Sequence, residues 1–406
     1  MPNPTAYNLV MRAPDRTWRG LLNDFISLKT TCKAHSAGKM TLELPNHYPL
    51  DWFECDAIFE VWRKPDCNVS GTPRPYLDSC WLNETVKCNN NCIKIEAVDP
   101  MARLLDRIVA YHGETAEALA NGLPADDLIK RIVRDAIGPG AGQYNLDPDP
   151  IRDLLPIGVA ADVGAAPVVP EMNFEHKKLG TVLKDIVNYA ASQGVFLGFC
   201  IEHTETTGTG QTWLEFRTRI GSIKTDRTSS VILSDKTCTL QEPELTLSWK
   251  KTATRVYAGG KGEDGARPVA IADDPAVGTS PNPWFLREKW HNAGNAEDPA
   301  AIQAEADAQL AGCAPHEQLT GKIPDTEGLK YGCDYFCGDL VRAEAKGREF
   351  NVHVESVSIT MRNGEESIDA RVSTNLNPVG SGLAGLAQEV AELRALVEQA
   401  NVVDNP

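Results

Sequence analysis

The sequence predicts a multidomain α+β protein in which β-rich stretches alternate with helical ones. Its 406 residues are too many for one ordinary core and suggest two to four domains. Short runs of alternating apolar residues, separated by turn residues, fill the first hundred positions. Helical spacing dominates the middle and strands return afterwards, an order that favours α+β domains over a doubly wound parallel sheet.

The first hundred residues predict a small barrel or sandwich. Apolar residues alternate across 40–44, and 57–63 is a compact run of large apolar residues. Such runs are typical of short strands that pack on a core. Two further runs, 80–88 and 93–98, flank three asparagines at 89–91 and predict a hairpin.

Three helices are predicted in the middle of the chain. Asp99 and Pro100 are residue types preferred at the N-cap and first position of a helix, and the apolar stripe that follows is Leu104, Leu105, Ile108 and Val109. Apolar residues recur at helical spacing across 125–137 and 179–192. The connection 138–170 is rich in Gly, Pro, Asp and Ala, which predicts a surface loop.

The last third predicts strands with a helical insertion. A Gly/Pro/Asp-rich segment at 259–283 predicts a mobile loop, and Asp298-Pro299 predicts another helix start. The apolar alternation in 350–361 changes phase near Glu355, which predicts a β-bulge, and Asn363-Gly364 predicts a two-residue hairpin turn. Strands are also predicted at 195–202, 212–219, 230–233, 245–257, 340–345 and 367–372.

The end of the chain carries a heptad pattern. From Val379 to Ala400, apolar residues are spaced alternately by four and three positions, which predicts a coiled-coil seam. The seam is short and glycine-rich at its start, so a single amphipathic helix docked on its own domain is the alternative. Valine at a and leucine at d favour two strands, so the pattern supports an oligomer without itself indicating a trimer. The predicted oligomerisation residues are Leu383, Leu386, Val390, Leu393 and Val397.

The net charge of −16 argues against binding to DNA or anionic lipid through the overall field, because such binding needs cations at the phosphates. Acidity serves solubility, and it also suits the wall of a channel that DNA passes without sticking. No signal peptide and no apolar run of membrane-spanning length is visible, which predicts synthesis in the cytoplasm and no stable membrane insertion.

The sequence offers no catalytic, cofactor-binding or metal-binding constellation. The H-E-x-x-H, G-x-S-x-G and phosphate-loop patterns are all missing, and the Gly-rich run at 259–262 lacks the context of a phosphate loop. The 11 cysteines predict reduced, buried thiols. Cys88 and Cys92 flank a turn and could face each other, and one or two disulfides remain an alternative. Assembly or binding is therefore favoured over an enzyme, with no metal and no cofactor.

Three stretches together resemble the siphophage tail-tip and baseplate hub family, which is itself similar to the trimeric hub of contractile-phage baseplates. The first runs from RGLLNDFISLK to IKIEAVDPMARLLDRIV, and the second is KLGTVLKDIVNYAASQGVFLGF with its following strands. The third and most specific is EGLKYGCDYFCGDLVR, with the pattern Y-G-x-D-Y-x-x-G-D-x-V, followed by its hairpin. Its Gly338-Asp339 predicts a tight turn at a strand start.

The resemblance implies a structural virion protein of the tail tip: a ring-forming hub, built as a homotrimer, that links the tail tube to the tip and lines the DNA exit channel. It also implies contacts with the distal tail protein, the tape measure protein and fibre or spike proteins, while phage DNA passes without specific binding. The expected parts are a β-barrel-like domain at 1–110, an α/β domain at 111–230, a second β-barrel-like domain at 231–378 with a helical insertion at about 259–314, and a C-terminal helix at 379–406.

A different class of function is a glycan-binding or glycan-cleaving tail-tip receptor protein. Eight tryptophans, with Trp284 and Trp290 near an exposed-looking loop, motivate this alternative because aromatic rings stack on sugars. Aromatic residues are more often part of a core. A secreted, disulfide-rich adhesin would need an export route that the sequence does not show.

Overall fold

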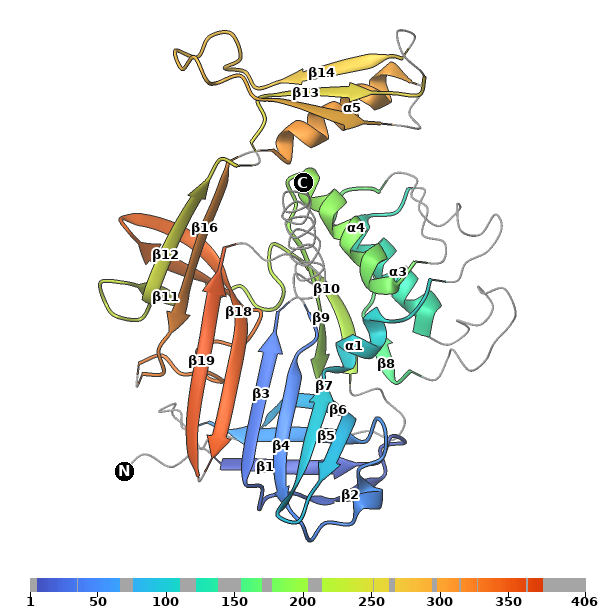
Figure 1. The fold of residues 1–406 in the computed structure, drawn as a ribbon, viewed down its shortest axis with the longest axis vertical. Helices are drawn as coiled ribbons and strands as arrows, with labels where there is room; N and C mark the ends of the chain where they lie inside the picture. Colours follow the sequence, from blue (N-terminus) through green and yellow to red (C-terminus); the bar gives the residue numbers. More distant parts are fainter. Residues whose placement is uncertain are drawn as a thin grey trace, which may run out of the picture.

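The computed structural model describes residues 6–34, 36–65, 76–109, 122–137, 155–169, 177–203, 214–250, 252–262, 267–293, 298–313, 315–326, 328–362 and 364–374. The protein is predominantly β, with one large sheet and two small three-stranded sheets (Figure 1). No helix among these residues is both long and apolar enough to cross a membrane.

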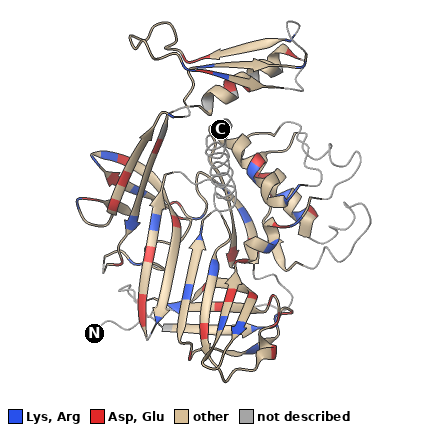
Figure 2. Ribbon diagram, viewed as in Figure 1, with Lys and Arg blue, Asp and Glu red and all other residues tan. Residues whose placement is uncertain are grey.

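Strands from both ends of the chain build the large sheet. The first β portion contains β1 (Ala6–Arg12), β2 (Trp18–Leu21), β3 (Ser27–Lys33), β4 (Lys39–Pro45), β5 (Ile58–Lys64), β6 (Tyr76–Cys88) and β7 (Cys92–Val98), with a short 3-10 helix at Leu50–Trp52. The last β portion contains β11 (Ile232–Ser234), β12 (Gln241–Ser248), β16 (His316–Ile323), β17 (Leu340–Ala345), β18 (Arg348–Arg362) and β19 (Glu365–Ser373). Acidic and basic residues are interspersed along both portions (Figure 2).

The two β portions meet where β3 pairs with β18. Their antiparallel register runs from Ser27 opposite Arg362 to Lys33 opposite Ser356. The predicted bulge is confirmed, because the register against β19 shifts between Val354 and Ser356. It separates the half of β18 that pairs with β17 from the half that pairs with β3.

The described strands close no barrel. The main path is open and runs in the order β12-β16-β19-β18-β3-β4-β7-β6-β5-β1-β2, with β17 and β11 attached at β18. Each β portion nevertheless has its own hydrophobic core, one around Trp81 and Phe59 and the other around Tyr335 and Val341. The β-rich regions predicted as two separate small barrels are therefore joined into one sheet through long-range pairing.

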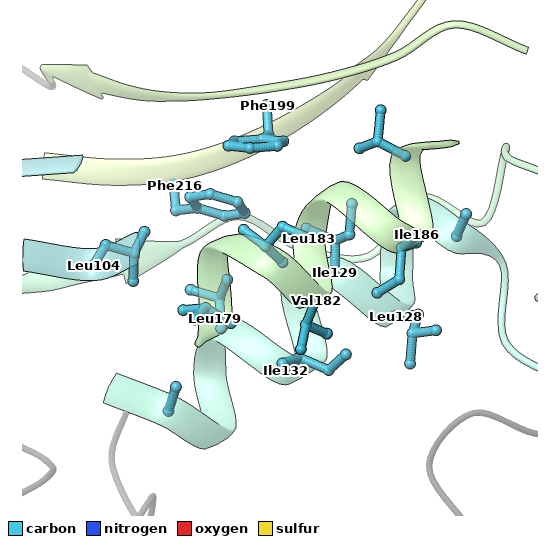
Figure 3. Packing of buried hydrophobic residues seen from close by; sticks show 14 of the residues in the cluster. Leu104, Leu128, Ile129, Ile132, Leu179, Val182, Leu183, Ile186, Phe199 and Phe216 are labelled. Carbon is cyan, nitrogen blue, oxygen red and sulfur yellow. The ribbon is translucent and has the colours of Figure 1, made fainter. Parts of the chain in front are cut away.

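Helices cover one of the small sheets, which consists of β8 (Ile157–Val159), β10 (Leu214–Ile220) and β9 (Leu197–His203) in that order. The helices are α1 (Pro100–Leu105), α3 (Ala125–Ile137) and α4 (Leu179–Ser192). Their apolar stripes meet Phe199 and Phe216 of the sheet (Figure 3). The predicted bounds of α3 and α4 are confirmed, and Asp99 caps α1 by accepting the Met101 N–H at 2.8 Å.

The first predicted helix is wrong beyond Leu105. Ile108 instead pairs with Lys178 in a β-bridge, and the Val109 N–H donates to the Lys177 carbonyl at 2.8 Å. Tertiary pairing with the chain before α4 therefore ends the helix early.

An accessory unit projects from the end of β12 and β16 (Figure 1). It consists of β13 (Arg255–Gly259), β14 (Val269–Asp273), β15 (Glu288–Asn292) and α5 (Pro299–Ala311). Two predictions are wrong here: the single strand at 245–257 is split between two sheets, and the expected loop at 259–283 contains β14. β14 was missed because it is short and contains two alanines, so its alternation of large and small side chains is weak, and because its flanks are rich in Gly, Pro and Asp.

Candidate functional site: the buried junction

The motif most specific to the resemblance folds as a compact segment between β16 and β17, here called the junction block (Tyr331–Asp339). Tyr331 and Tyr335 are buried in the core of the last β portion. Gly332 and Gly338 have φ of +84° and +91°, a left-handed conformation that glycine adopts without strain. The block is closed by the Gly332 N–H, which donates to the Tyr335 carbonyl at 3.0 Å.

Arg63 of β5 ties the first β portion to this block and to β19. Its guanidinium donates to both Glu366 carboxylate oxygens, at 2.8 and 3.0 Å, and to the Tyr331 carbonyl at 2.9 Å. The Tyr7 hydroxyl also contacts Arg63 and Glu366. Burial alone would lower the pKa of Arg63, but the hydrogen bond and charge of Glu366 raise it above its ordinary value. The junction therefore contains a charged, bidentate ion pair with both groups largely out of water.

Gly332 leaves room for this arrangement. A Cβ atom at position 332 would lie 2.4 Å from the Tyr76 hydroxyl and 2.6 Å from Nη1 of Arg63. Any side chain here would push Arg63 or Tyr76 out of place, so the motif glycine serves the ion pair as well as the backbone.

Asp339 ties the same block to the chain that leaves β10. One carboxylate oxygen accepts the Thr225 N–H at 3.1 Å, and the other accepts Nε of Arg227 at 2.6 Å and the Phe336 N–H at 2.9 Å. Its side chain is almost fully buried. The predicted turn at Gly338-Asp339 is confirmed, but sequence reasoning gave the carboxylate no role.

His353 of β18 is buried beside the junction. Its ring stacks on Phe196 with centroids 4.7 Å apart, and among the described residues neither ring nitrogen has a hydrogen-bond partner. Burial lowers its pKa to about 4, against a small opposing effect of Asp226. The imidazole is therefore neutral near pH 7 and resists protonation while the protein is folded.

We expect acid to destabilise the protein partly through His353. In the unfolded chain the imidazole takes up a proton at its ordinary pKa of 6.5, whereas in the folded protein it does so only at about 4. The stability that comes from keeping His353 neutral is therefore complete above pH 6.5 and is lost as the pH falls from 6.5 to about 4. The difference corresponds to about 3 kcal/mol. Urea denaturation of wild type and His353→Phe from pH 7 to 4 measures it: the wild type should lose that much more stability, whereas parallel curves would contradict the assignment.

Comparison with known proteins identifies the family. The Siphovirus ReqiPepy6 Gp37-like protein family matches residues 9–372, which is most of the chain and includes Arg63, the junction block and Glu366. The chain belongs to this Gp37-like family. A search among curated proteins finds no significant match.

Solved structures show that the Gp37-like chain has the fold of prophage tail proteins. The prophage tail protein gp18 from Listeria monocytogenes EGD-e is 10% identical with a TM-score of 0.53, covering 95% of this chain and 98% of that one. The 43 kDa tail protein of prophage MuSo2 from Shewanella oneidensis is 12% identical with a TM-score of 0.50, covering 91% and 98%. The siphovirus origin and the tail-protein fold that the resemblance predicted are confirmed.

The cysteines of the Gp37-like chain are mostly thiols. Cys333 in the junction block is disulfide-bonded, whereas Cys88 and Cys92, which could have faced each other across the turn, are free thiols. Burial raises the pKa of the Cys200 thiol to about 12, which keeps it protonated and unreactive. Among the described residues, no three His, Cys, Asp or Glu side chains are grouped so that they could hold a metal ion.

The predicted oligomerisation residues, Leu383 to Val397, lie outside the described residues. Of the tryptophans that motivated a glycan-binding alternative, Trp284 is 81% and Trp290 53% exposed. The structure therefore locates them on the surface of the accessory unit, away from the junction. The polar groups of the junction bind other parts of the same chain, which makes it a structural site.

Proposed function

We propose that this Gp37-like protein is the ring-forming hub of a siphovirus tail tip, linking the tail tube to the tip and acting without catalysis. The observation that carries the proposal is the junction: two charged networks, at Arg63 and Asp339, fasten β5, β19 and the chain after β10 to one block. Such cross-linking suits a part that must keep its shape under load. The family match and the tail-protein fold support it.

We further propose a homotrimer in the virion that lines the DNA exit channel. The proposed parts are 1–110, 111–230, 231–378 with its insertion, and 379–406, and the separate cores of the two β portions support treating them as two β-rich domains. The distal tail protein, the tape measure protein and fibre or spike proteins are the proposed neighbours. The net charge of −16 suits a wall that repels passing DNA.

Light scattering of the purified full chain at micromolar concentration tests the assembly. We expect an oligomer, seen as a ring in electron micrographs. A monomer in solution, together with virions that lack such a ring, would sink the proposal. Release of reducing sugar from bacterial envelopes by the purified chain would contradict the non-catalytic part.

The heptad seam has its own test. Replacing Leu386 and Leu393 by aspartate puts two charges into an apolar seam, so we expect a lower oligomer mass or an oligomer that dissociates at least about tenfold more readily. Glu389→Gln, outside the seam, is the matched control and should leave the mass unchanged. An unchanged mass in the aspartate variant would favour a helix docked on its own domain.

A further inference from the structure

The accessory unit covers only one face of its sheet. Ala258 and Ala272 point towards α5, where they pack with Ile302 and Ala306, and the buried Val256 lies opposite Ala272 in the register. The side chains that alternate with them form the opposite side, here called the open face. The open face consists of Arg255, Tyr257, Val269, Ile271, Asp273, Glu288, Trp290 and Asn292, with Arg267 reaching over it from the start of β14.

Trp290 is fixed in position although it is 53% exposed. A Cβ atom at Gly259 would lie 2.6 Å from Cζ2 of the indole, so the ring rests directly on the glycine backbone. The Arg267 guanidinium lies 5.4 Å from the indole centroid and is held by the Gly260 carbonyl at 2.7 Å. Tyr257 is the register neighbour of Trp290 on one side. Tyr257 is partly buried, and the Arg255 guanidinium lies 6.0 Å from its ring centroid. Two neighbouring aromatic rings, each with an arginine beside it, are therefore held in place on the open face.

Polar groups surround the rings and are also held in place. Arg255 donates to both oxygens of Asp273, at 2.6 and 2.7 Å, and the Tyr257 hydroxyl donates to Glu288 at 2.7 Å. Two arginines balance two carboxylates, so the open face is neutral within a chain of net charge −16. A neutral face gives no net attraction to nucleic acid or anionic lipid.

The size of the open face limits its occupant. Three strands of five residues span roughly 17 Å by about 14 Å, or on the order of 250 Å². A stable protein interface needs about 800 Å² on each partner, so this face alone fits a small ligand better. A sugar ring matches its chemistry: the C–H groups of one ring face pack on an aromatic ring, and hydroxyls bond to carboxylate and amide oxygens.

We propose that the open face binds an uncharged glycan, with Trp290 and Tyr257 as the stacking platform and Asp273, Glu288 and Asn292 as hydroxyl partners. This binding is separate from the junction, whose polar groups hold together parts of the same chain. It involves binding without cleavage.

Calorimetric titration of the full chain with chitohexaose, cellohexaose and α-1,6-linked mannohexaose tests the proposal. We expect at least one to bind with a Kd of about 1 mM or tighter. Trp290→Ala should weaken that binding at least about tenfold. Gly259→Ala, which displaces the indole and leaves every ring present, should weaken it too. Trp18→Ala, at a tryptophan that is 59% exposed on β2, is the matched control and should bind as the wild type does.

Three results would overturn the proposal. The first is that none of the three oligosaccharides binds. The second is that Trp290→Ala binds as tightly as the wild type, and the third is that Trp290→Ala lowers the oligomer mass in light scattering. The last outcome would make the open face a contact between copies of the chain. Unchanged thermal unfolding of Trp290→Ala confirms that any loss of binding is local.

Discussion

Arg63→Leu is expected to lower the free energy of unfolding by about 3–5 kcal/mol. The substitution leaves the Glu366 carboxylate in the junction, 13% exposed, without the guanidinium that binds both of its oxygens. It also removes the donor to the Tyr331 carbonyl. An uncompensated buried charge is among the most destabilising local changes, and urea denaturation at pH 7 measures it.

Two further variants separate the ion pair from simple loss of packing. The double variant Arg63→Leu with Glu366→Leu removes both charges, so it should be more stable than the single variant. Arg19→Ala breaks a pair whose side chains are 39% and 46% exposed, and it should change stability by less than about 1 kcal/mol. Equal losses at Arg63 and Arg19 would show that the junction pair contributes no more than a surface contact.

Asp339→Asn is expected to lower the free energy of unfolding by about 3 kcal/mol or more. Both carboxylate oxygens accept N–H donors, from Thr225 on one side and from Arg227 and Phe336 on the other. An amide presents one oxygen and one NH2 group, so either orientation sets a donor against a donor. The loss of a charge-assisted bond to Arg227 adds to this effect.

Asp334→Asn is the matched control in the same block. A single oxygen of Asp334 accepts the Lys330 N–H, at 2.7 Å, and asparagine can keep that bond with its own oxygen. Its effect should stay below about 1 kcal/mol. If thermal and urea unfolding place the two variants at the same stability, the carboxylate of Asp339 is not the element that holds the block.

Local patterns in the sequence predicted local structure well. The helices α3 and α4 have the predicted bounds because a full apolar stripe covers each one and packs on the β8-β10-β9 sheet. The bulge in β18 was visible as a change of phase near Glu355, because side chains on a strand alternate strictly. These features depend on residues a few positions apart.

Features that depend on distant residues could not be predicted. β3 and β18 pair across most of the chain, and nothing in either segment specifies the other as its partner. The position of Arg63 at the end of the apolar run 57–63 was the only sign in the sequence that its side chain could be buried. Its partner Glu366 lies 303 positions away. The strand β16 was missed because Gly321 interrupts its alternation, although Leu319 and Ile323 on either side are buried.

The pairing of β3 with β18 also bears on how the chain is made. Thr31 and Ser358 share a hydroxyl hydrogen bond of 3.0 Å across 327 positions, a distance that a ribosome covers in roughly 16–65 s. Throughout that time one edge of β3 has no strand beside it, and open edges invite pairing with other chains. A product released before β18 is synthesised keeps this edge exposed, so incomplete chains should be the ones that aggregate in the infected cell.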